Sequence, residues 1–174
     1  MQPELPSRAK PGFTHDNVKN ITADWYTPSS IFDAMGLRFD LDPCQPEQKI
    51  PWIPAEKHYH KAQDGLSQPW HGRVWLNPPY GKETAKWLQK MDTHRNGVAL
   101  VFARTDCKWF HDYCAKADAI NFLRGRIRFV DGLGLSAGNG AGAGSMLVAW
   151  GEANVQAISK LDGQLVTFGQ KRAA

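Results

Sequence analysis

The first part of the chain predicts a short helix followed by a strand. Residues 27–36 predict the helix, because Thr27 is a good amino-terminal cap and Pro28 suits the first helical position. Residues 39–42 alternate apolar with acidic side chains and stop at Pro43. This pattern is typical of a strand that leads into a functional loop.

The middle of the chain predicts a long irregular segment and then a strand. Residues 44–72 lack a sustained hydrophobic period and contain several prolines, so we expect most of this segment to be irregular. The compact apolar run at residues 73–76 predicts the strand, which ends at Asn77-Pro78-Pro79. Two prolines remove two backbone donors and cannot continue a central strand. We therefore expect a strand followed by a rigid loop.

The second half of the chain predicts further helices and closely spaced strands. Four residues at helical spacing indicate a helix, namely Thr84, Trp87, Leu88 and Met91. The other expected elements are a strand at 98–102, a helix over 109–117 and strands at 119–123, 127–130 and 146–150. Strands alternate with helices in the first part of the chain, and closely spaced strands follow one another in the last part. This order predicts an α/β fold, with a mostly parallel sheet and an antiparallel portion near the carboxyl end.

Length and composition are those of a globular protein. The chain has 174 residues, of which 42% are hydrophobic and 22% charged, enough to bury a core. Residues 1–20 are polar, contain several prolines and lack periodicity, so we expect a flexible arm and then one domain over 21–174. No apolar run approaches the ~20 residues of a membrane span, and the amino terminus lacks the apolar core of a signal peptide. These features predict a cytoplasmic protein.

Cysteines, histidines and net charge add little. Cys44, Cys107 and Cys114 show no paired spacing, so we expect thiols and no disulfide framework. His58 and His60 have no third ligand nearby, so no metal is expected. The net charge of +4 is compatible with a polyanionic partner, although many basic proteins bind no nucleic acid.

The most informative segment runs from Val74 to Gly81 and contains Asn77-Pro78-Pro79-Tyr80. The amino group of adenine is a poor nucleophile, because its lone pair is delocalised into the ring. A catalyst must accept hydrogen bonds from this group so that the lone pair can attack. The side-chain oxygen of Asn77 and the backbone carbonyl of Pro78 can both accept, and two fixed φ angles keep that backbone stiff.

Tyr80 adds a flat face against which a base can stack. Such stacking is worth ~1–3 kcal/mol, enough to help retain a base that has left its duplex. The same four residues can also form a plain rigid turn with a tyrosine packed beneath it. Their position directly after an α/β strand favours the functional interpretation, because ligand loops lie at the carboxyl ends of such strands.

Several further blocks accompany this segment. They are Trp25-Tyr26-Thr27-Pro28 with Phe32-Asp33-Ala34, Phe39-Asp40-Leu41-Asp42-Pro43-Cys44, Asp64-Gly65-Leu66 with Trp70, Ala103-Arg104-Thr105-Asp106 with Trp109-Phe110-His111, and Arg124-Gly125-Arg126-Ile127-Arg128-Phe129. In this order the blocks resemble the small phage-type DNA N-6-adenine methyltransferases (Dam family), from about Trp25 to Trp150. The resemblance implies a compact Rossmann-like methyltransferase fold, S-adenosylmethionine as cofactor, double-stranded DNA as substrate, and a phage or prophage origin.

The resemblance also implies a role for each block. Asn77, Pro78, Pro79 and Tyr80 would orient the target adenine. Asp42, Pro43 and Cys44 resemble the start of the cofactor loop, Tyr26, Thr27 and Pro28 resemble the block over the methionine part of the cofactor, and Asp64 would contact its adenosine.

One departure from the larger relatives concerns the cofactor loop. They continue the aspartate-proline pair with a glycine-rich turn, whereas here Cys44 is followed by Gln45-Pro46-Glu47-Gln48. Only 34 residues separate Asp42 from Asn77. We therefore expect a reduced or rearranged cofactor half.

Basic and aromatic residues in the second half are candidates for DNA contacts. Arg104, Arg124, Arg126 and Arg128 could bind phosphates, or they could simply face solvent from a strand. Phe129 could form a second wall of the base pocket, or it could belong to the core.

The sequence thus predicts a site-specific DNA adenine methyltransferase, with two alternatives. One is a methyltransferase acting on a protein glutamine or an RNA adenine, because Asn-Pro-Pro-Tyr suits any planar amide or amino group. The other is an inactive DNA-binding relative, against which the intact segment from Asn77 to Tyr80 argues. No oligomeric state follows from the sequence.

Overall fold

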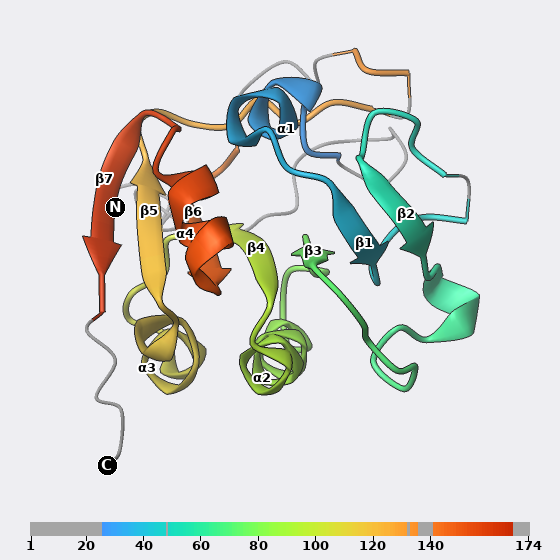
Figure 1. Ribbon diagram of the computed structural model, residues 1–174, viewed down its shortest axis with the longest axis horizontal. Helices are drawn as coiled ribbons and strands as arrows, with labels where there is room; N and C mark the ends of the chain where they lie inside the picture. The colour runs from blue at the N-terminus through green and yellow to red at the C-terminus, as the bar shows by residue number, and fades with distance from the viewer. Residues whose placement is uncertain (1–25, 48, 132, 136–140, 169–174) are drawn as a thin grey trace, which may run out of the picture.

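A seven-stranded sheet forms the centre of the molecule, and helices lie against both of its faces (Figure 1). The computed structural model describes residues 26–47, 49–131, 133–135 and 141–168, so the predicted arm over 1–20 lies outside the described residues. The strands are β1 (Phe39–Asp42), β2 (Ala55–His58), β3 (Val74–Leu76), β4 (Gly97–Phe102), β5 (Ala119–Leu123), β6 (Ser145–Trp150) and β7 (Gly163–Thr167). Their order across the sheet is β2-β1-β3-β4-β6-β5-β7.

The sheet is parallel on the side of the early strands and antiparallel on the side of the late ones, as the sequence predicts. β1 pairs parallel with β2 and β3, and β3 pairs parallel with β4. β6 is antiparallel to both β4 and β5, and β7 is antiparallel to β5. The register of β4 with β6 runs from Gly97 opposite Trp150 to Phe102 opposite Ser145.

Helices cover the two faces of the sheet in pairs. The helices are α1 (Ser29–Met35), α2 (Thr84–His94), α3 (Lys108–Asp112) and α4 (Glu152–Ile158), with single 3₁₀ turns η1 (Lys61–Gln63) and η2 (Cys114–Lys116). Successive side chains of a strand point to opposite faces. In β4, Val98 and Leu100 pack in one core cluster with α1 and α4, whereas Ala99 and Val101 pack in the other with α2 and η2. The sheet is therefore buried on both sides.

The first two predicted helices are confirmed as α1 and α2, with one correction at α1. Thr84, Trp87, Leu88 and Met91 form the buried face of α2. Thr27 does not cap α1: the capping position falls on Pro28, and no side chain caps that end. Thr27 is instead buried, and its hydroxyl has no hydrogen-bond partner among the described residues.

Three other predictions about secondary structure need correction. The irregular segment 44–72 contains β2 and η1. Residues 127–130 form no strand, because only Val130 pairs, in an isolated antiparallel bridge with Tyr26. The helix expected over 109–117 is α3 followed by η2. No helix within the described residues is long and apolar enough to cross a membrane.

The order of the strands creates a crevice between β1 and β3. The chain leaves β1 toward β2 on one side, and it leaves β3 toward β4 on the other. The connections after these neighbouring parallel strands therefore diverge, which leaves room for a ligand at their carboxyl ends. Asp42 ends β1 and Asn77 follows β3, so both lie at this crevice.

Candidate active site

A cleft of about 890 Å³ lies at the carboxyl ends of β1 and β3. All four predicted catalytic residues, Asn77, Pro78, Pro79 and Tyr80, line this cleft. Six predicted cofactor residues also line it, namely Tyr26, Thr27, Asp42, Pro43, Cys44 and Asp64. Pro28 lies instead at a second hollow beside α1. The fold thus brings together segments that are distant in the sequence.

Tyr80 stacks on an aromatic residue that sequence reasoning placed only in a strand. Its ring lies 4.2 Å from the ring of Phe102, centroid to centroid, with 12° between the planes. Phe102 ends β4, the parallel neighbour of β3, so the pairing of these strands brings the two rings together. Tyr80 remains 42% exposed. Phe102 therefore supports Tyr80 from one face and leaves part of the tyrosine open to the cleft.

The hydroxyl of Tyr80 donates a hydrogen bond to Oδ1 of Asn77 at 3.3 Å. Asn77 therefore points its side-chain oxygen, and not its amide nitrogen, toward the hydroxyl of Tyr80. That orientation makes the oxygen available as an acceptor for an amino group, as the chemistry of the segment requires.

Thr84, at the start of α2, ties the loop to the helix. Its hydroxyl donates to the carbonyl oxygen of Pro79 at 3.0 Å and accepts from the backbone N–H of Gly81 at 3.1 Å. The side chain of Thr84 is buried. The two prolines and this pair of hydrogen bonds hold the loop in one conformation.

Asp42 is a buried carboxyl group at the floor of the cleft. It is 3% exposed, and burial raises its pKa from 3.8 to about 7. The backbone N–H of Cys44 donates to its Oδ1 at 3.0 Å, which offsets part of this rise. Burial and the neighbouring Asp42 raise the pKa of the Cys44 thiol.

The loop that carries Asp64 packs closely against the loop after β1. A Cβ atom on Gly65 would lie 2.2 Å from the carbonyl oxygen of Pro43. Only glycine allows this approach. The indole N–H of Trp70 also donates to the carbonyl oxygen of Gly65 at 2.8 Å, which holds the loop from its other side.

Lys90, on α2, fastens the same loop. Its ammonium group donates to the carbonyl oxygens of Leu66 at 2.6 Å and Gln68 at 2.5 Å. It also lies 5.1 Å from the centre of the Trp70 ring. Burial lowers the pKa of Lys90, while the charge of Asp64 partly opposes this effect. Lys90 thus joins α2 to one wall of the cleft.

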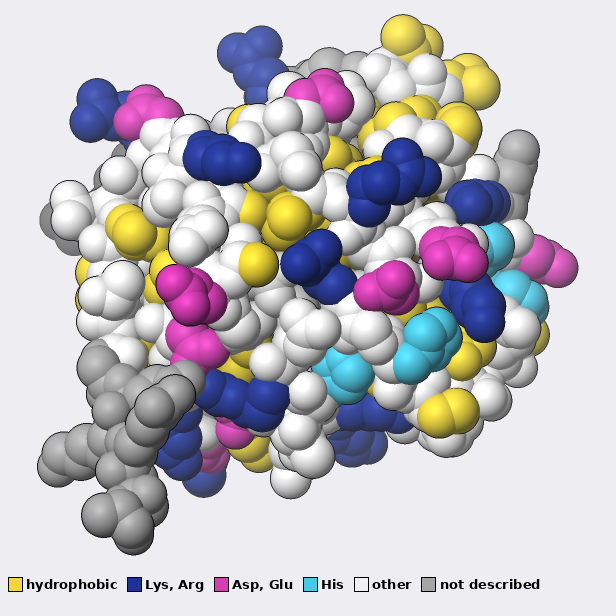
Figure 2. Space-filling model, in the orientation of Figure 1, with side chains coloured by type: hydrophobic (Ala, Val, Ile, Leu, Met, Phe, Trp, Pro, Cys, Tyr) yellow, Lys and Arg dark blue, Asp and Glu magenta, His cyan; other side chains and the backbone are white. Residues whose placement is uncertain are grey.

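The candidate DNA-binding residues lie outside the cleft. Arg124, Arg126 and Arg128 line the second hollow, of about 470 Å³. Arg104 follows β4 and is exposed. Figure 2 shows Lys and Arg side chains interspersed with acidic ones on the face in view, so this face carries no continuous basic patch.

Phe129 does not line the cleft. It is 8% exposed and packs in the core cluster of α1 and α4, because the side chains of residues 126–129 alternate between solvent and the core. Its predicted contact with the target base is therefore not supported, and the aromatic partner of Tyr80 is Phe102.

Several residues of the site were not predicted in this role. Phe102 and Trp75 lie in strands, where the sequence gives no sign of a role beyond packing. Lys90 lies on α2, outside the apolar face of that helix. Thr84 carried a usable signal, since a threonine three residues after Gly81 can bond the backbone of the preceding turn. Among the described residues, no group of three or more His, Cys, Asp or Glu could hold a metal ion.

The seven-stranded α/β sheet, with its cleft at the crevice between β1 and β3, is consistent with a methyltransferase fold. A sequence profile of the family described as DNA N-6-adenine-methyltransferase (Dam) matches residues 14–169. The chain therefore belongs to this family, and it is a DNA adenine methyltransferase. The match favours DNA adenine over the alternative substrates. No curated protein and no solved structure matches the chain.

Proposed function

We propose that this enzyme transfers the methyl group of S-adenosylmethionine to N6 of an adenine within a specific DNA sequence, and that Asn77 to Tyr80 hold the adenine. The observation that carries the proposal is the meeting of the Asn77 oxygen and the Tyr80 ring in one cleft. S-Adenosylmethionine supplies, when bound, a methyl group on a positively charged sulfur.

Asn77 and Pro78 act on the amino group of the adenine. The oxygen that now accepts the Tyr80 hydroxyl would accept an N6 proton instead, and the carbonyl of Pro78 would accept the other. These bonds draw the lone pair of N6 out of the ring and direct it at the methyl group. Transfer leaves N6 with a positive charge, and N6 then loses one of its own protons to water, while Asn77 and Pro78 accept hydrogen bonds from the amino group.

Tyr80 holds the base by stacking. Phe102 covers one face of its ring, so the base would stack on the part of Tyr80 that remains exposed. Extrusion of the base from the duplex requires unstacking and unpairing, and this stack offsets part of that cost.

The residues of the cleft fit S-adenosylmethionine. The hydroxyl of Thr27 and the indole N–H of Trp75 are buried in the cleft wall without hydrogen-bond partners among the described residues. Buried polar groups are normally paired, so this wall is suited to a polar ligand. Asp42 and Asp64 would favour the positive charge of the cofactor. We assign Tyr26, Thr27, Asp42, Pro43, Cys44 and Asp64 to the cofactor.

The DNA duplex would contact the arginines outside the cleft. Arg124, Arg126 and Arg128 follow β5, whose carboxyl end lies at the same edge of the sheet as that of β4. They are exposed, which suits phosphate contacts around an extruded base. The resemblance to small phage-type enzymes supports a phage or prophage origin and action in the bacterial cytoplasm.

Asn77→Ala tests the proposal, with Asn77→Asp as the matched variant that keeps an acceptor oxygen. We expect Asn77→Ala to lower kcat about 100-fold or more with little change in thermal stability, because the lost bond acts in the transition state. Asn77→Asp should retain more activity. The measurement is transfer of labelled methyl groups to duplex DNA, with the product base identified by mass spectrometry.

Two results would contradict the proposal. Activity of Asn77→Ala within about threefold of wild type corresponds to less than ~1 kcal/mol, and it would exclude the assigned role of Asn77. Methyl groups found on a base other than adenine, or at N1 rather than N6, would exclude the proposed reaction.

A further inference from the structure

Lys82 is held in a fixed turn directly after the loop from Asn77 to Tyr80. The backbone N–H of Gly81 donates to Oγ1 of Thr84 at 3.1 Å, and the backbone N–H of Thr84 donates to the carbonyl oxygen of Gly81 at 3.3 Å. Lys82 and Glu83 are the two central residues of this turn. The φ of Gly81 is 126°, a conformation that glycine adopts readily. The turn therefore fixes the backbone of Lys82 relative to Tyr80.

This turn places Lys82 at the mouth of the cleft. Tyr80 and Glu83 both line the cleft and are exposed, and Lys82 stands between them in the chain. Lys82 is also exposed, but it does not line the cleft itself. Its ammonium group is therefore available to a ligand outside the cleft, beside the ring that would hold the adenine.

Lys82 has no acidic partner among the described residues. Its neighbour Glu83 pairs with Lys86 instead, at 2.9 Å between Oε2 and Nζ. Lys82 takes part in none of the ion pairs of the described residues. Lys57, on β2, is equally exposed and also lacks an ion pair, so exposure by itself assigns no role. The position of Lys82 beside Tyr80 is what distinguishes the two lysines.

The charges of the cleft keep DNA phosphates at its mouth. One lysine, Lys61, lines the cleft together with four acidic residues, namely Asp42, Glu47, Asp64 and Glu83. An extruded adenine base is neutral and can enter. The two phosphates that flank its sugar are negative, and the acidic residues would repel them. These phosphates therefore stay outside, where a cation stabilises them.

Lys61 lies at the wrong end of the cleft for this contact. It begins η1, which follows β2, and β2 lies on the far side of β1 from β3. Tyr80 stacks on Phe102 at the end of β4, on the other side of β3. An adenine that stacks on Tyr80 therefore has its phosphates near Lys82 and not near Lys61.

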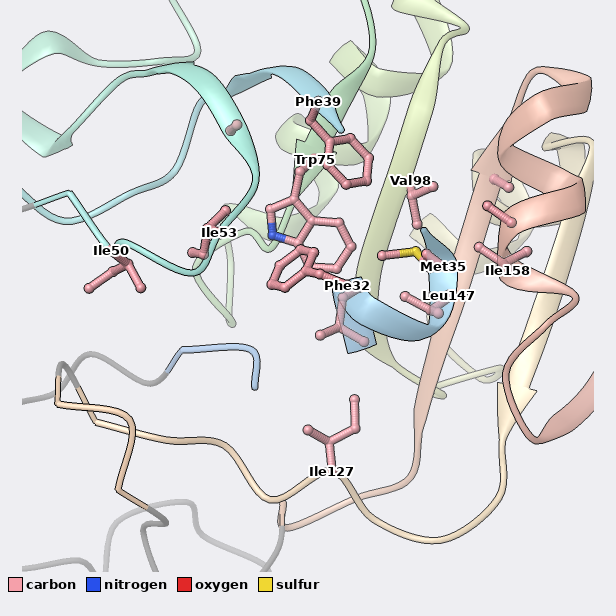
Figure 3. Packing of buried hydrophobic residues seen from close by; sticks show 14 of the residues in the cluster. Phe32, Met35, Phe39, Ile50, Ile53, Trp75, Val98, Ile127, Leu147 and Ile158 are labelled. Atoms are coloured by element: carbon pink, nitrogen blue, oxygen red, sulfur yellow. The ribbon is translucent and has the colours of Figure 1, made fainter. Parts of the chain in front are cut away.

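The predicted DNA-binding arginines lie on the opposite face of the sheet from Lys82. Ile127, between two of these arginines, packs with Phe32 and Met35 of α1 (Figure 3). α2 begins two residues after Lys82 and packs in the cluster on the other face. The arginines and Lys82 thus flank the carboxyl edge of the sheet from both faces. This arrangement suits a duplex that lies along the edge, with the extruded adenine between the two sets of cations.

We infer that Lys82 binds a phosphate next to the target adenine and so holds the extruded nucleotide at the mouth of the cleft, an inference that rests on the proposed function. A lysine binds phosphate as a point charge, so the contact carries no sequence information. It positions the nucleotide whose base Tyr80 and Asn77 would hold.

The test removes the two charges one at a time. Lys82→Met removes the ammonium group, and a methylphosphonate linkage removes the charge of one phosphate. Each duplex carries one target adenine, in a sequence taken from DNA that the wild-type enzyme has methylated. Binding is measured by fluorescence anisotropy with S-adenosylhomocysteine, the product of the cofactor, present.

The expected result is that the two changes are not additive. In the wild type, a methylphosphonate at one of the two phosphates flanking the adenine should weaken binding about tenfold. Lys82→Met should bind the native duplex about tenfold more weakly than the wild type, and the same methylphosphonate should then change its affinity less than about twofold.

Lys57→Met and Lys82→Arg are the controls. Lys57 lines neither hollow and lies on β2, the edge strand at the other end of the sheet from the arginines. Its replacement removes the same charge, yet it should leave both the affinity and the effect of the methylphosphonate within about twofold of wild type. Lys82→Arg keeps a cation at the mouth and should stay sensitive to the methylphosphonate.

The outcomes separate this contact from the proposed function. The contact would be overturned if Lys82→Met bound the native duplex as tightly as the wild type, or if the methylphosphonates weakened both proteins equally, while the wild type still methylated adenine. A wild-type enzyme that neither methylates adenine nor binds DNA would overturn the proposed function, and the contact with it.

Discussion

Replacement of Lys90 by methionine would show whether the loop at residues 64–68 holds the cofactor. In the native protein the ammonium group donates to the carbonyl oxygens of Leu66 and Gln68 and lies over the ring of Trp70. Methionine keeps most of the apolar stem and removes the charged donor. The loop would then depend on the hydrogen bond from Trp70 to Gly65 and on its own turn.

The magnitude follows from the contacts that are lost. A hydrogen bond to a charged group contributes ~1.5–3 kcal/mol net, and a cation–π contact at a partly exposed site ~0.5–1 kcal/mol. The loop keeps the hydrogen bond from Trp70, so we take the loss of free energy that stabilises its closed conformation as about 2 kcal/mol. Such a loss can weaken a ligand that needs the closed loop by up to about 30-fold. We expect about a tenfold rise in Kd for S-adenosylmethionine.

The assay separates cofactor affinity from DNA affinity and from stability. For Lys90→Met we expect the weaker cofactor binding by calorimetry, unchanged DNA binding by fluorescence anisotropy, and kcat within about twofold at saturating cofactor. Lys90→Arg should restore most of the affinity, because it restores a charged donor. Lys108→Met is the control, since Lys108 pairs with Asp112 on α3 and lines neither hollow. A lower Tm with an unchanged cofactor Kd would refute the reasoning.

Two further predictions concern the base and the buried acid. Tyr80→Phe should keep kcat/KM within about threefold, whereas Tyr80→Ala should lose about 10- to 100-fold, because the ring and not the hydroxyl stacks on the base; equal losses, measured by methyl incorporation, would make Tyr80 a hydrogen-bonding residue. Burial raises the pKa of Asp42 from 3.8 to about 7, so the group is neutral below this pH and ionised above it. A cationic cofactor favours the ionised form, so its affinity should rise with pH through about 7, with proton release. The unfolded chain ionises near 3.8, so the contribution of Asp42 to the free energy of unfolding should fall from about pH 4 to about pH 7. Asp42→Asn should remove both effects. If the variant and the wild type showed identical pH profiles of cofactor affinity in titration calorimetry and of the free energy of unfolding, this account would be contradicted.

The sequence by itself determined the elements whose signal is local. The buried face of α2, the apolar strand β4 and the end of α1 at Gly36 all follow from spacing and from residue chemistry within a few positions. The role of the loop from Asn77 to Tyr80 is likewise a prediction from local chemistry, because an adenine amino group requires acceptors on a stiff backbone and an aromatic face. These features need no knowledge of which segments are neighbours.

Only the tertiary structure decided the elements whose stability comes from a partner. β2 is nearly polar, with only Ala55 buried, and it is a strand because it pairs with β1. Residues 126–129 alternate between exposed and buried side chains as a strand does, yet the β-bridge of this segment with the described residues is that of Val130 with Tyr26. Alternation predicts which side chains are buried, but it does not specify the neighbouring strand.

The same limit applies to the site. Phe102 meets Tyr80 because β4 is the parallel neighbour of β3, and Lys90 reaches carbonyl groups more than 20 residues earlier in the chain. Trp75 reads as an ordinary core residue until the packing shows that its nitrogen has no acceptor. The sequence predicts a catalytic role for the loop from Asn77 to Tyr80 because the chemistry of that loop is local. The walls of the cleft required the fold, since their contacts join segments that are distant along the chain.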